Sequence, residues 1–191
     1  MFQHCEWLNE PAQWSIDDDR LRVVTRPASD FWQKTHYGFI RDSGHLFGMK
    51  VAGDFTAQVH VQGDYQHLYD QAGVMVRIDD QTWLKTGIEV SDGELMLGSV
   101  LTDGHSDWAT GCWNDKGTGL WLRVTVSNAV VRIQSSTDGV RWPLLRLAPF
   151  PQAEHYWVGP MCCSPQGNAL NVVFSAFTVG PANGKDLHDL T

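Results

Sequence analysis

The sequence predicts an all-β protein, built as a β-sandwich or jelly roll of two antiparallel sheets. Short runs of β-branched and apolar residues recur along the chain, separated at short, regular spacing by turn-forming Asp, Gly and Ser residues. Helical periodicity is nowhere sustained. A length of 191 residues suffices for one sizeable core, so we expect a single domain over residues 1–180 and a frayed polar tail over residues 181–191.

The first third of the chain predicts two clear strands. Residues 21–25 alternate well enough to form one strand, and residues 54–61 form another with an apolar face. The acidic run 17–19 lacks the glycine and distal glutamate of a calcium loop, so we expect a solvated turn there. Residues 30–50 hold a dense mixture of aromatic and histidine side chains, which is typical of ligand sites and equally of buried corners in all-β folds.

The stretch from Asp70 to Trp113 reads as three strands, over residues 72–78, 83–90 and 95–102. Asp92-Gly93 joins the last two and is the strongest hairpin signal in the chain, because a type I′ turn needs positive φ at both central positions. A connection of three residues between the first two strands keeps their apolar side chains on one face. A connection of two would mix the faces.

These turns define a register with one apolar and one polar face. The expected cross-strand pairs are Arg77 with Trp83, Met75 with Lys85, Gly73 with Gly87, Gln71 with Glu89, Glu89 with Met96, Gly87 with Gly98, Lys85 with Val100, and Trp83 with Thr102. Gly73, Gly87 and Gly98 thus align across the polar face, and a glycine inside a strand often marks a close approach. The row is either the floor of a ligand groove or a relief of curvature beneath other parts of the fold.

Two outcomes would separate these interpretations of the glycine row. A side chain of His36 or Trp108 that reaches over the row would indicate a binding site. A row capped by its own loops would be no more than a curved sheet.

The rest of the chain predicts further antiparallel strands. Residues 104–108 read as a polar loop, and residues 121–125 and 130–136 form a hairpin around a two-residue turn. Residues 157–163 and 169–179 are two more strands. The adjacent cysteines at the end of the first of these would point to opposite faces, where small apolar fillers are expected.

The composition excludes several classes of partner. The chain has 22 acidic against 14 basic residues and no basic stripe, which argues against nucleic acid. No apolar run approaches membrane-spanning length, and the first residues lack the pattern of a secretory signal, so we expect no membrane association and a cytoplasmic location with reduced thiols. The cysteine and histidine spacing matches no zinc pattern, and no phosphate-binding glycine loop or nucleophile elbow is present. We therefore expect no metal and no cofactor.

Several stretches together resemble one known family over nearly the whole chain. They are Asp30-Phe31-Trp32, Thr35-His36-Tyr37-Gly38, Asp70-Gln71-Ala72-Gly73, Trp83-Leu84-Lys85-Thr86-Gly87-Ile88-Glu89, Ser106-Asp107-Trp108, Ser136-Thr137-Asp138-Gly139 with Trp142, and Val158-Gly159-Pro160-Met161-Cys162-Cys163-Ser164-Pro165. The family is the domain of unknown function numbered 1349, whose fungal branch is named for regulation of enolase. The resemblance implies a concanavalin A-like jelly roll, the fold of many lectins and glucanases, and it implies no established reaction.

The polar face of the central strands supports a first hypothesis of function, a binding module for a carbohydrate or similar small polar ligand. Sugar recognition needs an aromatic platform and polar groups that can form paired hydrogen bonds. The candidate ligand-binding residues are His36, Tyr37, Gln71, Arg77, Trp83, Lys85, Glu89 and Trp108. The alternative is an exposed strand face whose charged residues form only weak surface ion pairs.

Two further hypotheses stay open. A glycoside hydrolase would use Glu89 with a second carboxylate from a loop, Asp70 or Asp107, although the repeated acidic positions of a jelly-roll glucanase strand are missing. An intracellular regulatory or interaction protein of the regulation-of-enolase type rests on the resemblance alone, and its protein partner is unknown.

Overall fold

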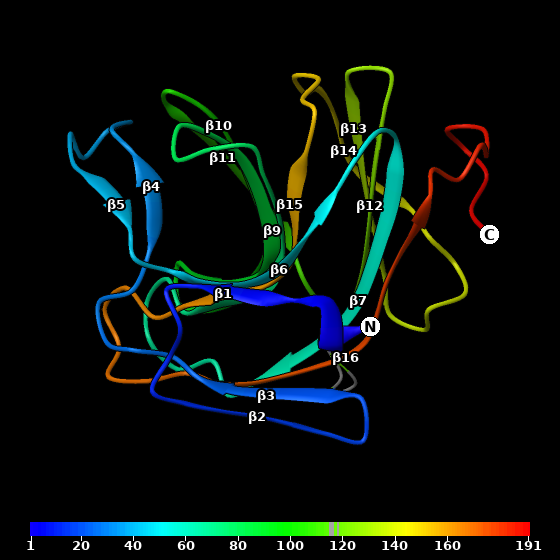
Figure 1. The fold of residues 1–191 in the computed structure, drawn as a ribbon. Coiled ribbons are helices and arrows are strands. Elements are labelled where there is room, and N and C mark those ends of the chain that lie inside the picture. Colours follow the sequence, from blue (N-terminus) through cyan, green and yellow to red (C-terminus); the bar gives the residue numbers. More distant parts are fainter. Residues whose placement is uncertain (115–116, 118) are drawn as a thin grey trace.

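Two antiparallel sheets of seven strands each stack face to face, and a two-stranded hairpin lies beside one of them (Figure 1). The structure is a computed structural model that describes residues 1–114, 117 and 119–191. The first sheet, sheet A, contains in spatial order β1 (Glu6–Leu8), β6 (His45–Val51), β15 (Tyr156–Cys163), β8 (Gln71–Arg77), β9 (Thr82–Ser91), β10 (Glu94–Asp103) and β11 (Ser106–Cys112). The all-β jelly-roll sandwich predicted from the sequence is therefore the observed fold.

Sheet B forms the other layer of the sandwich. It contains in spatial order β14 (Leu144–Pro149), β13 (Val130–Ser136), β12 (Leu120–Ser127), β7 (Phe55–Gly63), β16 (Asn171–Pro181), β3 (Arg20–Val24) and β2 (Gln13–Asp17). The separate hairpin consists of β4 (Phe31–Gln33) and β5 (Ile40–Asp42), and a short 3₁₀ helix, η1 (Phe2–His4), precedes β1. Strands β8, β9 and β10 bend strongly, and β4–β5 stands on the inner side of the bend (Figure 1).

The predicted register of the central strands is confirmed. Every expected pair between β8 and β9 and between β9 and β10 is present. Asp92 and Gly93 have φ angles of 54° and 81°, as a type I′ turn requires. The hairpin of β12 and β13 is also confirmed, with Asn128 and Ala129 both at positive φ.

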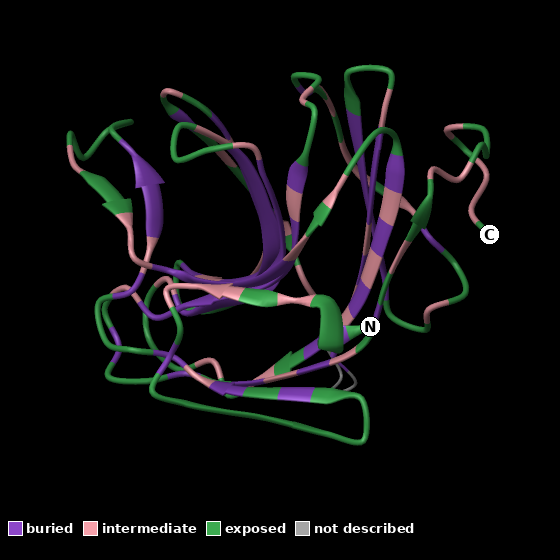
Figure 2. Cartoon of the chain, in the orientation of Figure 1, coloured by how far each residue is buried: buried purple, intermediate pink, exposed green. Residues whose placement is uncertain are grey.

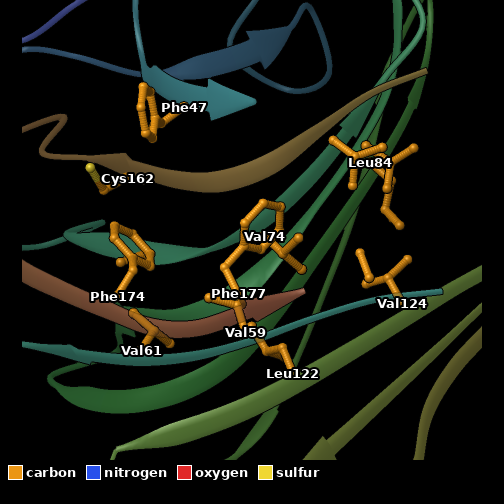
Figure 3. Close-up of a cluster of buried hydrophobic side chains, with 14 of the residues drawn as sticks. Phe47, Val59, Val61, Val74, Leu84, Leu122, Val124, Cys162, Phe174 and Phe177 are labelled. Carbon is orange, nitrogen blue, oxygen red and sulfur yellow. The ribbon is translucent and has the colours of Figure 1, made fainter. Parts of the chain in front are cut away.

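The main core lies between the two sheets. Val74 and Leu84 project from sheet A toward Val59, Leu122 and Val124 of sheet B (Figure 3). All five side chains are fully buried, and the alternation along each strand directs them into this core. Removing these apolar surfaces from water is the main driving force for stacking the sheets.

A second apolar cluster lies on the other face of sheet A. It contains Phe31, Trp32, Leu46, Met75, Trp83, Val100, Met161 and Cys163. The β4–β5 hairpin covers this face, so β8 is buried along its whole length, and the bent strands appear purple in Figure 2. Cys162 belongs to the main core and Cys163 to the second cluster, which confirms the prediction that they point to opposite faces. Burial raises the pKa of both thiols, as expected for inert fillers.

Several elements differ from the sequence prediction. Residues 106–112, whose start was assigned to a polar loop, form strand β11, which pairs with β10 along its length. This edge strand is largely exposed and carries few apolar residues, so its alternation is weak. Strands β1, β2, β4, β5, β6 and β14 are also absent from the sequence prediction, because they are short or contain glycine or exposed polar residues.

The C-terminal residues are not frayed. Strand β16 runs to Pro181, and the residues after it continue across the outer face of sheet B. Backbone N–H of Trp142 donates a 2.8 Å hydrogen bond to the carbonyl oxygen of Leu190, and Asn183 N–H donates to Thr56 Oγ1 at 2.9 Å. The polar tail is therefore an ordered covering of the sheet.

Two further findings concern the part of the chain that the structure describes. None of its helices is long and apolar enough to cross a membrane. Its His, Cys, Asp and Glu side chains form no group of three or more that could hold a metal ion.

Candidate ligand-binding cavity

A cavity of about 380 Å³ lies between the bent strands of sheet A and the segment that contains β4 and β5. Its lining combines aromatic rings with charged and amide side chains. The lining residues are Ala28, Asp30, Trp32, Tyr37, Phe39, Arg41, Tyr69, Gln71, Lys85, Glu89, Trp108, Pro165 and Gln166. The cavity falls in the size range of small-molecule sites, which are typically about 300–1,000 Å³.

The glycine row shapes the sheet beneath this cavity. A Cβ on Gly73 would lie 1.9 Å from the carbonyl oxygen of Thr86, and one on Gly87 would lie 2.0 Å from that of Ala72. The backbones of β8 and β9 therefore approach too closely here for any side chain, which is what a sharp bend requires. Of the two interpretations, the relief of curvature accounts for these two glycines.

Gly98 has a different role from its two neighbours. A Cβ on Gly98 would lie 2.7 Å from Oε2 of Glu89, so the glutamate side chain occupies the space over this glycine. A void of only about 10 Å³, close to the size of one water molecule, remains over Gly87 and Gly98. The glycine row thus lies one layer below the main cavity, with Glu89 and Lys85 between the row and the cavity. The expectation that the row forms the floor of a ligand groove is therefore corrected.

Lys85 attaches the hairpin segment to the sheet. Its ammonium group donates a 2.7 Å hydrogen bond to the carbonyl oxygen of Phe31 and lies 3.3 Å from Oδ1 of Asp30. Both side chains are largely buried, and buried ions are tolerated only when paired and hydrogen-bonded. These contacts hold β4 over the concave side of sheet A and keep the cavity between them.

Glu89 is the most perturbed carboxyl group at the site. It is 7% exposed, and its hydrogen-bond partner is Trp108 Nε1, which donates to Oε2 at 3.0 Å. Burial raises the pKa of Glu89 to about 7. The positive charge of Lys85 and the indole hydrogen bond act in the opposite direction, and Asp30 adds to the rise. No cation in the described chain lies within ion-pairing distance of this carboxyl group, because Lys85 pairs with Asp30 instead.

Four rings around the cavity contact one another in sequence. Trp32 lies edge-on to Trp108 at 6.3 Å between centroids and to Tyr37 at 5.8 Å, and Tyr69 lies edge-on to Trp108 at 6.1 Å. The hydroxyl groups of Tyr37 and Tyr69 share a 2.8 Å hydrogen bond, which closes the circle. This bond is the main reason that the pKa of Tyr69 is raised to about 12. We refer to Trp32, Tyr37, Tyr69 and Trp108 as the aromatic box.

Five of the eight candidate residues line this cavity. They are Tyr37, Gln71, Lys85, Glu89 and Trp108. Trp108 donates to Glu89, whose side chain lies over Gly98, so its link to the glycine row runs through this glutamate.

The other three candidates lie elsewhere. Arg77 forms a two-pronged ion pair with Asp42, at 2.6 and 2.9 Å, and Trp83 is fully buried in the second cluster. His36 is exposed at the tip of the hairpin with its ring against Tyr37. Arg77 and Trp83 occupy the expected face of the sheet, but at the end that the hairpin covers.

Sequence reasoning missed five residues of the lining that carry aromatic rings or charge. They are Asp30, Trp32, Phe39, Arg41 and Tyr69. Four of them belong to the dense aromatic stretch over residues 30–50, so the signal was present in the composition. The composition did not show that this stretch lies over sheet A.

The fold and site define a class of protein: a concanavalin A-like jelly roll with a small-molecule-sized cavity on the concave face of one sheet. A carbohydrate-binding module, CBM66 from Bacillus subtilis, shares the fold with a TM-score of 0.57 at 12% identity, over 91% of this chain and 94% of that one. Residues 7–182 match the family described as "Protein of unknown function (DUF1349)", and the chain belongs to this family.

Comparisons with Saccharomyces cerevisiae show much higher similarity, both in sequence and in structure. "Regulation of enolase protein 1" is 53% identical over 185 residues, which cover 97% of this chain and 93% of the relative. The crystal structure of a functionally unknown protein from the same yeast has a TM-score of 0.93 at 51% identity. That similarity covers 96% of this chain and 99% of the other. The family and the fold predicted from the sequence are both confirmed.

Proposed function

We propose that the protein binds a carbohydrate or similar small polar ligand in the cavity between sheet A and the β4–β5 segment. The observation that carries the proposal is the meeting of the aromatic box with buried hydrogen-bonding groups in one cavity. Rings of this kind pack against the apolar faces of a sugar, while Gln71, Gln166 and Glu89 offer donors and acceptors to its hydroxyl groups. The fold shared with a carbohydrate-binding module supports the proposal by analogy.

Thermal-shift screening across monosaccharides and oligosaccharides tests this proposal. A ligand should raise the melting temperature of the native chain and lose that effect in Tyr37→Ala, where a half-exposed ring is removed from the rim. Trp14→Ala is the matched control, because Trp14 is a similarly exposed aromatic residue on β2, outside the cavity. The proposal fails if no sugar shifts the transition, or if the shift survives unchanged in Tyr37→Ala.

A glycoside hydrolase is the second candidate, and the raised pKa of Glu89 favours it. A general acid needs a pKa near the working pH, and the pKa of Glu89 is about 7. The loop carboxylates suggested by the sequence do not line the cavity: Asp70 is buried and accepts from Ser164 Oγ at 2.6 Å, while Asp107 pairs with Arg146. Asp30 is the remaining carboxyl group of the lining, and Lys85 neutralises it.

Binding therefore ranks above hydrolysis. Release of a chromophore from aryl glycosides that disappears in Glu89→Gln would reverse this order. A regulatory role rests only on the name of the yeast relative and ranks below both.

A further inference from the structure

The aromatic box differs from a flat stacking platform. Its neighbouring rings meet at steep angles: 87° between Trp32 and Trp108, 78° between Tyr69 and Trp108, and 69° between Trp32 and Tyr37. A flat platform suits the broad face of a pyranose ring. The rings of the box instead stand edge-on to one another around one cavity, where a compact, rounded cation can contact more than one of them.

The charged side chains around the aromatic box differ in the partners that they have within the protein. The ammonium group of Lys85 is held by the carbonyl oxygen of Phe31 and by Asp30. The guanidinium of Arg41 lies 4.5 Å from the centre of the Phe39 ring and donates to the carbonyl oxygen of Ile40. Lys85 is thus paired with a carboxylate, whereas Arg41 is exposed and has no ion-pair partner among the described residues.

Glu89 is the buried charged group of the described lining that has no ion-pair partner. Its carboxyl group is more than nine-tenths buried, lines the cavity and accepts its one hydrogen bond from Trp108, a wall of the box. A buried carboxylate is costly unless it is paired. A positively charged ligand group beside it would supply the missing partner.

We propose that the ligand of this cavity carries an ammonium group, which lies within the aromatic box beside the carboxylate of Glu89. The inference rests on the proposed function and names the class of ligand: an amino sugar or another small amine, in place of a neutral sugar. Cation–π contact with the rings and an ion pair with Glu89 would act together on the same group.

The charged and titratable groups that face Glu89 define the expected pH dependence. They are Lys85 on the same strand, Asp30 before β4, Tyr69 before β8, and Cys163 on β15. Since the pKa of Glu89 is about 7 in the free protein, this carboxyl group is partly protonated at neutral pH. A cation binds the ionised form better, so its affinity should rise as pH increases through 7.

Two matched pairs of probes test the inference by isothermal titration calorimetry. The first pair is glucosamine and glucose, and the second is choline and its neutral carbon isostere, dimethylbutanol. In at least one pair the ammonium compound should bind about ten-fold tighter or more. The pair that responds distinguishes an amino sugar from a quaternary amine as the source of the charge.

Glu89→Gln should remove the preference within the responding pair, and Glu94→Gln is the matched control at an exposed position beyond the Asp92-Gly93 turn. For choline, whose charge does not titrate, affinity should rise between pH 6 and 8 in the native chain, as ionisation of a group with a pKa of about 7 requires, and stay flat in Glu89→Gln. Thermal melts of both variants report that they are folded.

The possible outcomes separate the two proposals. Equal binding of the charged and neutral members of each pair overturns the ammonium inference and leaves ligand binding intact. Binding of choline without any sugar supports the ammonium group and overturns the carbohydrate assignment. Absence of binding by all four probes overturns the ammonium inference, while the sugar screen decides the proposed function by itself.

Discussion

Each of the two sheets has a segment of the chain lying across its outer face, but the two segments differ in the partners that they supply to the charged side chains beneath them. On sheet B, the C-terminal residues lie across the strands. Arg132 donates to the carbonyl oxygens of Lys185 and Asp186, at 2.9 and 3.3 Å, and also bonds to Asn183. On sheet A, the β4–β5 segment lies across the strands and satisfies Lys85, but it leaves a cavity and an unpaired Glu89.

This difference shows which feature distinguishes a site from a covered polar face. Both faces carry charged and aromatic side chains, so polarity alone does not separate them. The covering segment of sheet B supplies partners to the guanidinium groups beneath it, and Arg123 also lies 3.8 Å from the centre of the Trp142 ring. The covering segment of sheet A leaves a buried acid facing open space, and strongly perturbed acids of that kind cluster at functional sites.

The bend of sheet A depends on the close approach of β8 and β9 at Gly87, and Gly87→Ala should destabilise it. The new Cβ would meet backbone atoms of β8 at 2.0 Å, which only a shift of the strands can relieve. We expect a loss of about 4 kcal/mol or more in the free energy of unfolding, measured by urea titration. Gly111→Ala on β11 is the control: its Cβ meets nothing within 4 Å, and its effect should be small. Equal effects of the two substitutions would show that the bend does not require Gly87.

The unpaired acid should make the stability of sheet A depend on pH, and Glu89→Gln should remove this dependence. The pKa of Glu89 is raised from 4.5 to about 7 in the native state, so the native chain holds this proton more tightly than the unfolded chain. Its contribution to stability is fully present below pH 4.5 and is lost as pH rises through 7.

Relative to the native sequence, Glu89→Gln should therefore gain stability from pH 4.5 to 8, by at most roughly 3 kcal/mol. Urea titrations at several pH values measure this difference. Glu94→Gln, at an exposed position, should show no such trend. A constant difference between Glu89→Gln and the native chain at all pH values would mean that the carboxyl group is not desolvated.

The geometry of the central strands could be predicted because its causes are local. Side-chain alternation and the Asp92-Gly93 turn determine which residues oppose one another, and the same rules placed Gln71, Lys85 and Glu89 on one face. Sharing a face does not ensure sharing a cavity. Arg77 lies on that face too, yet at the end where the hairpin supplies Asp42 as its partner.

The covering of each sheet could not be predicted, because it depends on contacts between distant parts of the chain. Lys85 binds Asp30 and Phe31 across 55 and 54 residues, and this contact brings Trp32 over the sheet. Nothing in the local pattern of residues 30–42 indicates that partner. The C-terminal tail presents the same difficulty, since its polar composition suggested fraying while its carbonyl groups cap Arg132.

The smallest expected effect concerns the covering of sheet B. Arg132→Met should cost about 1–2 kcal/mol in the free energy of unfolding. The substitution removes the guanidinium group, which donates hydrogen bonds to the carbonyl oxygens of Lys185 and Asp186 and to the side chain of Asn183. Hydrogen exchange should accelerate at the N–H groups of Asn183 and Trp142, which hold the tail at both ends. Arg22→Met, at an exposed position on β3, is the control and should leave exchange at these groups unchanged. Ligand binding on sheet A should also be unchanged, whereas a loss of binding would show that the two coverings are coupled through the core.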